Sequence, residues 1–203
     1  MTTRRLLLAS ATALAATSLL NACAPLLIGG AVASGALMYS DRRTSGAQLE
    51  DQAIELKAGP RLKEALGDRA HLNVTSYNRL VLITGEVASE ADREAAQKAV
   101  ASIENVRSTV NESAVMGLSS LTSRSNDALL TSKVKAAFID NGNIQANAVK
   151  VVTERATVHL MGRVTEKEAA KAAEVASTVS GVQKVVRVFE IISDEELKAI
   201  EKR

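Results

Sequence analysis

The sequence predicts an α+β protein that contains two tandem copies of one unit, each with the order helix–strand–strand–helix–strand (αββαβ). A β-like run that ends in Gly-x-Val occurs twice, at 80–87 and at 157–164. An alanine-rich stretch with helical spacing follows each run. The chain has 203 residues, of which 46% are hydrophobic and 24% charged, as expected for folded domains.

Each copy is expected to start with a helix. Leu130, Val134 and Phe138 recur every four residues in the second copy. The first copy has Ile54, Leu62 and Leu66 in the corresponding helix. Because proline cannot donate the helical hydrogen bond, we expect Gly59-Pro60 to interrupt this first helix or to delay its start.

The next two strands of each copy form a predicted hairpin. The upstream strands are expected at 71–78 and 149–153, with turns at 77–79 and 153–155. Gly85 and Gly162 interrupt the downstream strands, and we interpret both as sites of close helix–sheet packing rather than ligand sites.

The second helix of each copy has recognisable ends. Ser89-Glu90-Ala91-Asp92 and Thr165-Glu166-Lys167-Glu168 both fit a capping box. Asn105 and Gly181 follow the helices, where a left-handed residue is preferred. A last strand is predicted at 106–115 and at 182–192.

The N-terminus has the features of an export signal. Arg4 and Arg5 precede the apolar run 6–20, and Leu20-Asn21-Ala22-Cys23 resembles a bacterial lipobox. In such signals the cysteine is diacylated and becomes the new N-terminus, so Cys23 is the predicted lipidation site. The alternative is an uncleaved membrane helix with an incidental cysteine, although 15 residues are short of the roughly 20 that span a bilayer.

Cleavage before Cys23 leaves 23 basic and 23 acidic side chains. The mature chain is therefore neutral, which does not suit a general nucleic-acid binder. By resemblance to the sorting rules of Gram-negative lipoproteins, Ala24 after Cys23 favours the outer membrane, with the protein on its periplasmic face. We expect the segment 24–38 to follow the bilayer interface and the polar segment 41–48 to be flexible.

The two copies resemble the BON domain (bacterial OsmY and nodulation domain), and with the lipobox they resemble dual-BON-domain outer-membrane lipoproteins. The resemblance is carried by short matching stretches: Ser125-Asn126-Asp127, Thr131-Ser132-Lys133-Val134, Leu160-Met161-Gly162-Arg163-Val164-Thr165-Glu166 and Ser180-Gly181-Val182. It implies two helices packed on a small mixed three-stranded sheet in each copy. The implied organisation is a signal peptide at 1–22, the acylated cysteine and tether at 23–45, BON domains at 46–115 and 124–193, and a polar tail, a short helix or frayed end, at 194–203.

The family resemblance also implies binding of anionic phospholipid by the second BON domain, division-site enrichment and support of envelope integrity. We expect the lipid contact on the helix that begins near Asn126. Its predicted residues are Leu129, Ser132, Lys133 and Ala136. Leu129 would enter the acyl boundary while Lys133 meets phosphate. The alternative is that Leu129 packs against the first domain.

The charge distribution is compatible with this prediction. Residues 46–115 carry 8 basic and 11 acidic side chains, whereas 124–193 carry 10 basic and 7 acidic ones. A basic second domain is attracted to anionic headgroups. Ordinary scatter of charges is the other interpretation.

The sequence offers little for catalysis. His71 and His159 lie in strand patterns without a metal-ligand spacing, and no G-x-S-x-G elbow occurs. We therefore expect no enzymatic activity, cofactor, metal, nucleic acid or small-molecule substrate. The rival function is a periplasmic adaptor for an envelope assembly machine or cell-wall regulator, with β-augmentation at the sheet edge of the acidic first domain and only incidental lipid contact.

Overall fold

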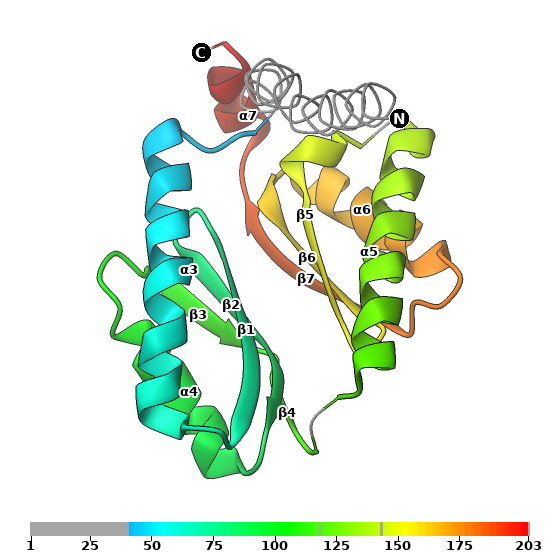
Figure 1. Cartoon of the computed structure of the whole chain (residues 1–203). Coiled ribbons are helices and arrows are strands. Elements are labelled where there is room, and N and C mark those ends of the chain that lie inside the picture. Colours follow the sequence, from blue (N-terminus) through cyan, green and yellow to red (C-terminus); the bar gives the residue numbers. More distant parts are fainter. Residues whose placement is uncertain (1–40, 118, 143, 203) are drawn as a thin grey trace, which may run out of the picture. The chain divides into compact units, whose positions relative to one another are not determined.

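The computed structural model describes residues 41–117, 119–142 and 144–202, and the chain from Asp41 onward forms one compact unit. Cys23, the export signal and the predicted interfacial tether lie outside the described residues. The first copy contains α3 (Ser45–Leu66), β1 (Ala70–Tyr77), β2 (Leu80–Val87), α4 (Glu90–Ala101), β3 (Ser108–Asn111) and β4 (Ala114–Val115). The second contains α5 (Leu121–Asn141), a 3-10 turn (Ala146–Ala148), β5 (Lys150–Glu154), β6 (Thr157–Val164), α6 (Glu166–Thr178) and β7 (Lys184–Ile191), followed by α7 (Asp194–Glu201) (Figure 1).

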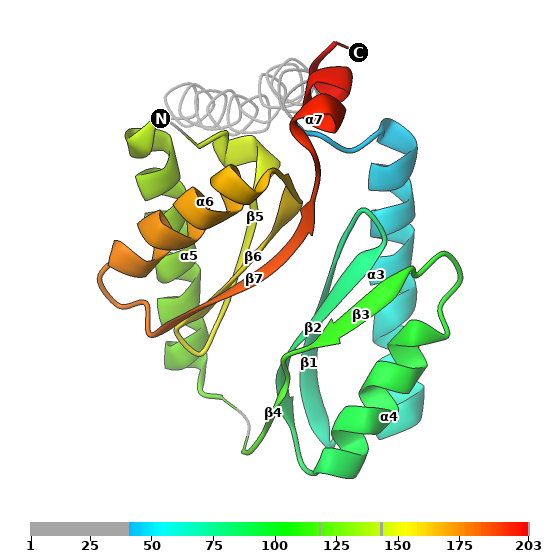
Figure 2. The same ribbon diagram turned by 180° about the vertical axis from the view of Figure 1, so that it is seen from behind.

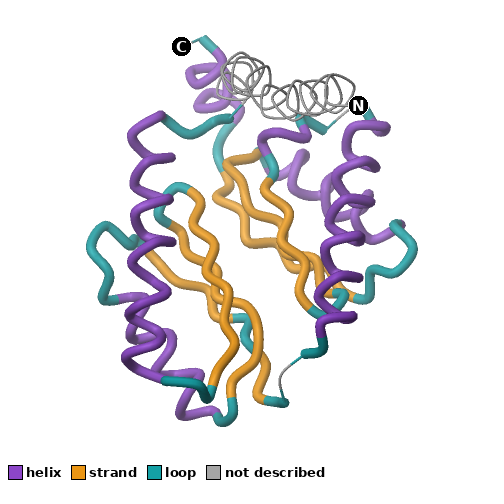
Figure 3. Tube along the Cα trace, in the orientation of Figure 1, coloured by secondary structure: helices purple, strands orange, loops and turns teal. Residues whose placement is uncertain are grey.

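Both copies have the same sheet topology, which confirms the predicted α+β fold with helices on small mixed sheets. In the first copy β2 is central, antiparallel to β1 and parallel to β3. In the second copy β6 is central, antiparallel to β5 and parallel to β7 (Figure 1). Figure 3 shows the strands of both sheets in orange and the helices in purple. The short β4 also pairs with β2 in parallel.

The helices of each copy cover one face of its sheet (Figure 2). Alternate residues of a strand point to opposite faces, so Val81 and Ile83 of β2 face the helices. They pack with Ile54 of α3 and Val100 of α4. In the second copy the corresponding core surrounds Phe138. Alanines on the second helices, among them Ala96 and Ala172, are fully buried and bring each helix close to its sheet.

The helix-free faces of the two sheets pack against each other. Tyr77 and Leu82 from the first copy form one buried cluster with Met161 and Val188 from the second. These side chains have the strand parity opposite to that of the helix-facing cores. The two copies therefore share a third apolar core between their sheets.

Opposite charges meet around this shared core. Lysine and arginine side chains of the second copy lie close to glutamates of the first: Lys150 to Glu55 at 3.0 Å, Arg155 to Glu86 at 3.6 Å and Lys184 to Glu112 at 3.9 Å. Arg107 of the first copy also pairs with Glu190 of the second at 2.9 Å, so both copies contribute cations to this junction. Part of the basic charge of the second copy is therefore used in joining the copies and is not available to a membrane.

Helix α3 corrects one prediction, because it continues through Gly59 and Pro60 to Leu66. Pro60 has no N–H to donate to the carbonyl of Leu56. Both Leu56 and Pro60 are exposed, so water can satisfy that carbonyl. Tertiary packing of the opposite face keeps the helix whole.

Two further predictions differ from the structure. The single strand expected at 106–115 is divided into β3 and β4. Asn111 causes the break, because its Oδ1 accepts hydrogen bonds from the backbone N–H of Ser113 at 3.1 Å and from its hydroxyl at 2.6 Å. The segment 41–44, expected to be flexible, is bound to the rest of the fold, and α3 starts directly after it.

The two strand glycines have a different role from the one expected. A Cβ on Gly85 would lie 2.1 Å from the carbonyl oxygen of His71, and one on Gly162 would lie 2.4 Å from that of Ala148. Gly85 also has a φ of 110°. Glycine is required because the neighbouring backbone approaches too closely for a side chain, not because a helix packs there.

The helix-end predictions hold in most respects. Asn105 and Gly181 have positive φ angles of 68° and 103°. Thr165 and Glu168 form a complete capping box at α6. At α4, Ser89 accepts from the N–H of Asp92 at 3.1 Å, but the structure shows only this half of the box.

Candidate functional site

Helix α5 is held in a fixed rotation by its buried face. Leu130, Val134 and Phe138 lie in the core, as predicted. Asp127, also buried, accepts hydrogen bonds of 2.9 Å from the backbone N–H groups of Arg155 and Ala156 in the β5–β6 turn. Because a helix turns 100° per residue, anchoring this face determines which residues face outward.

The opposite side of α5 is an apolar face without a partner in the described part of the chain. Leu121, Leu129 and Ile139 are 78%, 62% and 67% exposed. We call this surface the α5 outer face. It consists of large apolar residues interleaved with small ones: Leu121, Ser125, Ala128, Leu129, Ser132, Ala136 and Ile139. Since Leu129 is exposed, it does not pack against the first copy.

Two lysines flank the α5 outer face. Helical spacing places Lys133 on one side of it and Lys135 on the other, and both are exposed. Within the ranges that the structure describes, neither lysine forms an ion pair. A stripe of leucine and isoleucine between free ammonium groups has the chemistry of a helix that lies in a bilayer interface.

The structure places the predicted binding residues together. Leu129, Ser132 and Ala136 lie on the α5 outer face, Lys133 lies beside it, and the Ser132 hydroxyl donates to the carbonyl of Ala128 at 3.1 Å. Sequence reasoning missed Leu121, Lys135 and Ile139. The separation of Leu121 and Ile139 by 18 residues, five helical turns, was the available signal.

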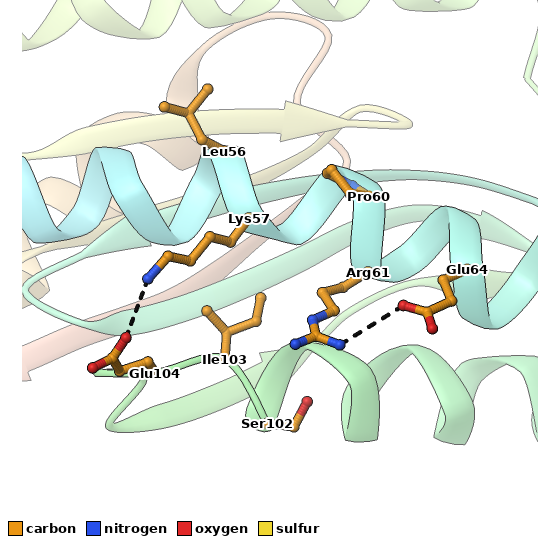
Figure 4. A pocket seen from close by; sticks show the side chains of 8 residues that line it. All are labelled: Leu56, Lys57, Pro60, Arg61, Glu64, Ser102, Ile103 and Glu104. Atoms are coloured by element: carbon orange, nitrogen blue, oxygen red, sulfur yellow. Dashed lines mark hydrogen bonds and ion pairs between the residues drawn. The ribbon is translucent and has the colours of Figure 1, made fainter.

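A concave surface lies on the first copy, between α3 and the segment after α4 (Figure 4). This cavity of about 680 Å³ is lined by Leu56, Lys57, Pro60, Arg61, Glu64, Ser102, Ile103 and Glu104. Its charged groups pair with one another, Lys57 with Glu104 at 3.4 Å and Arg61 with Glu64 at 3.7 Å. The paired charges leave no convergent acid, base and nucleophile for catalysis.

The histidines occupy structural positions. His159 is 2% exposed, and burial lowers its pKa, while nearby Glu112 opposes that shift. His71 lies beside the buried Glu86, with 3.7 Å between Nδ1 and Oε2. The described residues contain no cluster of three or more acidic, histidine or cysteine side chains suited to a metal ion. None of the described helices has the length and apolarity of a membrane span.

The chain matches the BON domain family model twice, over residues 50–116 and 126–193. It belongs to the BON-domain family, and it is not an enzyme.

Three relatives illustrate the family. The chain is 35% identical to the outer membrane lipoprotein DolP of Haemophilus influenzae, over 88% of this chain and 93% of that protein. It is 33% identical to a 21 kDa hemolysin of Actinobacillus pleuropneumoniae, with 75% and 79% coverage. It is 28% identical to the osmotically-inducible protein Y of Escherichia coli, with 75% and 78% coverage.

Proposed function

We propose that this DolP-like lipoprotein of the outer membrane uses its second BON domain to bind anionic phospholipid through the α5 outer face. The observation that carries the proposal is the exposed stripe of Leu121, Leu129 and Ile139 between two lysines that form no ion pair with any described residue. The stripe is displayed by a helix whose other side is fixed in the core. A rigid, preoriented apolar face can enter the interface without first rearranging.

The magnitudes indicate a weak but useful contact. Full burial of a leucine side chain contributes roughly 1.5–3 kcal/mol. Each lysine near an anionic surface adds about 1 kcal/mol. The outer face inserts only partly, so the folded unit alone binds weakly. On an anchored protein the same contact is intramolecular, and the raised effective concentration makes it effective.

The proposed anchor is Cys23. Diacylation there, with acylation of the new amine, gives more than one buried chain, and each buried methylene contributes about 0.8 kcal/mol. The thioether would also account for the single cysteine of the chain. The mass of the mature N-terminus tests this part of the proposal, because an unmodified thiol contradicts it.

The test of lipid binding uses the chain from Asp41 onward, which is one compact unit. We expect Leu129→Glu to abolish co-sedimentation with phosphatidylglycerol vesicles, because a carboxylate in the interface is repelled by phosphate. Leu56→Glu is the matched control, since Leu56 is also exposed, at 77% against 62% for Leu129, on the corresponding helix α3 but lies outside the α5 outer face. Circular dichroism checks the fold of both variants.

Binding by wild type must depend on anionic lipid and weaken with salt, because the lysine contribution is screened. Unchanged sedimentation of Leu129→Glu, or equal loss in Leu56→Glu, would contradict the assignment of lipid binding to α5.

We further propose that this lipid contact biases the lateral distribution of the protein toward division sites and supports envelope integrity. Lipid composition would guide the distribution, because a confined protein responds to small differences in headgroup affinity. In cells, a fluorescent fusion carrying Leu129→Glu should stay membrane-bound through its anchor but lose midcell enrichment. Persistent enrichment would contradict a lipid-guided mechanism.

The exposed Leu56 beside the cavity on the first BON domain supports a second candidate function, docking of an envelope protein. The predicted β-augmentation could use either edge of the first sheet: β3 has only four residues and is interrupted before β4, whereas β1 has eight. An adaptor would lose its partner in Leu56→Glu and ignore vesicle charge, which distinguishes the two functions.

A further inference from the structure

The segment before α3 is fastened to the second BON domain. The Arg42 side chain is 3% exposed and forms a bidentate ion pair with Glu168, at 2.6 Å and 2.8 Å. It also donates to the carbonyl of Arg163 at 2.9 Å and to Gln145 at 3.3 Å. Buried, bidentate arginine–carboxylate pairs are geometrically demanding, so they define one position of the chain.

Glu168 is the N3 carboxylate of the capping box at α6, and α4 has Asp92 at this position. Asp92 also pairs with an arginine, but that residue is Arg69 of the same domain, at 3.0 Å. The strand glycines Gly85 and Gly162 are 77 residues apart, whereas Asp92 and Glu168 are 76 apart, so the position equivalent to Arg69 is Gln145 or Ala146. The second domain therefore lacks its own arginine here, and Arg42 takes that place.

The residues on either side of Arg42 hold the segment against the first domain. Arg43 forms ion pairs with Asp41 and Asp51, both at 2.7 Å. Its guanidinium lies 4.3 Å from the centre of the Tyr77 ring, a cation–π distance. We call the segment 41–44 the tether root, because it is the described end of the chain that leads back to Cys23.

The tether root lies beside the α5 outer face. Asp41, Arg43 and Tyr77 line a cavity of about 260 Å³ together with Lys135 and Ile139 of α5. Only 17 residues lie between Cys23 and Asp41, so the two are at most about 60 Å apart when the chain is fully extended. An anchored N-terminus thus joins the folded unit next to the apolar stripe.

We propose that Arg42 is a positioning residue that locks the tether root to the second BON domain and so presents the α5 outer face to the bilayer that holds the acyl chains. The proposal rests on the proposed function. The lock removes orientations in which α5 faces away from the membrane, and this raises the effective concentration of the stripe at the lipid surface. The partner is a phospholipid surface, and the contact surface combines the tether root with α5.

The experiment uses the full acylated protein in vesicles of phosphatidylethanolamine and phosphatidylglycerol that contain a spin-labelled quenching lipid. A fluorophore is attached through Ala128→Cys on α5, and a reference fluorophore through Gln97→Cys on α4, in separate preparations. With wild-type Arg42, we expect lipid quenching at 128 and little at 97. Arg42→Ala should reduce quenching at 128 about twofold or more while the protein stays vesicle-bound.

Arg69→Ala is the matched control, because it removes the corresponding arginine–carboxylate pair from α4 and leaves the tether root intact. It should lower thermal stability less than Arg42→Ala, because the Arg69 side chain is 62% exposed and that of Arg42 only 3%, and it should leave the quenching unchanged. Should Arg42→Ala fail to fold, Glu168→Gln replaces it, since glutamine keeps the capping box and removes the charge. It should also reduce quenching at 128.

The outcomes separate the two proposals. Equal quenching at 128 in wild type and in folded Arg42→Ala or Glu168→Gln would overturn the positioning role of Arg42. It would leave the proposal of lipid binding by α5 intact. Absence of quenching at 128 in wild type would overturn both. Equal losses in Arg42→Ala and Arg69→Ala would show a general effect of stability and would also overturn the lock.

Discussion

The two BON domains share their buried hydrogen bonds and strand glycines but differ on the outer faces of their first helices. In each domain a buried aspartate of that helix accepts hydrogen bonds from the N–H groups of the hairpin turn: Asp51 from Asn78 and Arg79, and Asp127 from Arg155 and Ala156. Each central strand contains a glycine opposite a carbonyl of its neighbour. The shared parts build the fold, so a domain-specific function must come from the surfaces.

The outer faces differ in the availability of charge. Helix α3 also exposes leucines, Leu49 and Leu56. Its nearby cations are engaged, because Lys57 pairs with Glu104, Arg61 with Glu64 and Lys63 with Asp68. On α5 the lysines at 133 and 135 have no such partner in the described residues. The comparison teaches that an exposed leucine is common to both helices, whereas free cations beside it distinguish the second domain.

Replacing the strand glycines should destabilise both domains, and the effect should be larger in the first domain. We expect Gly85→Ala and Gly162→Ala to lower the free energy of unfolding by at least about 3 kcal/mol each, because the added Cβ collides with a backbone carbonyl. Gly85→Ala should cost more, since its φ of 110° also strains an L-residue. Urea unfolding followed by circular dichroism measures both. A loss below about 1 kcal/mol would show that the neighbouring strand moves aside.

The buried helix aspartates Asp51 and Asp127 should contribute unequally to the stability of the two domains. Asp51→Ala should cost about 3 kcal/mol and Asp127→Ala about 2 kcal/mol, because each leaves buried N–H groups unpaired. Asp51 additionally binds Ser76 and Arg43. Equal losses in urea unfolding at pH 7 would contradict this difference.

The cost of Asp51→Ala should also depend on pH. Burial tends to raise the pKa of Asp51, but hydrogen bonds from Ser76, Arg79, Arg43 and Asn78 lower it overall. Its contribution is therefore present above the unfolded pKa of about 4 and is lost as the pH falls through the lower folded value. Repeating the urea series in acid should show a shrinking difference between wild type and Asp51→Ala. A constant difference would contradict the shifted pKa.

His159 offers the smallest and most domain-specific effect. His159 is equivalent to Leu82 of the other domain, because the central strands of the two repeats are 77 residues apart in the sequence. Both side chains are buried between the sheets. Burial lowers the pKa of His159, so protonation favours unfolding and stability is lost as the pH falls below about 6.5. His159→Leu should flatten this dependence and add about 1 kcal/mol at pH 7, since neither ring nitrogen has a hydrogen-bond partner among the described residues.

Thermal melts from pH 7.5 to 5 test the prediction. Leu82→Met is a suitable control, because it perturbs the same core without a titrating group. Equal pH slopes in wild type and His159→Leu would exclude His159 as their source.

The sequence predicted the features that depend on local pattern. Helical spacing identified Leu130, Val134 and Phe138 as buried, and the capping residues identified the start of α6 at Thr165. The exposed positions of Leu129 and Lys133 also followed from spacing, while their role in lipid binding stays a prediction. The helix break predicted at Pro60 was wrong, because tertiary packing outweighs one missing hydrogen bond.

The features that depend on distant contacts could not be predicted. The partner of Arg42 lies 126 residues away, and nothing near Arg42 in the sequence indicates Glu168. The steric role of Gly85 needs the position of the His71 carbonyl on the adjacent strand. The absence of an arginine at 145 and 146, where the second repeat aligns with Arg69, was the one visible sign, and it has meaning only after the two repeats are aligned.

The apolar core shared by the two sheets has a consequence for how the protein folds. Tyr77 and Leu82 bury themselves only when Met161 and Val188 are in place, so half of the chain cannot complete its own structure. Unfolding of one repeat exposes the apolar side chains of the other repeat to water. The two repeats should consequently unfold in a single cooperative transition. Truncation between them should yield fragments that self-associate through the exposed apolar sheet face.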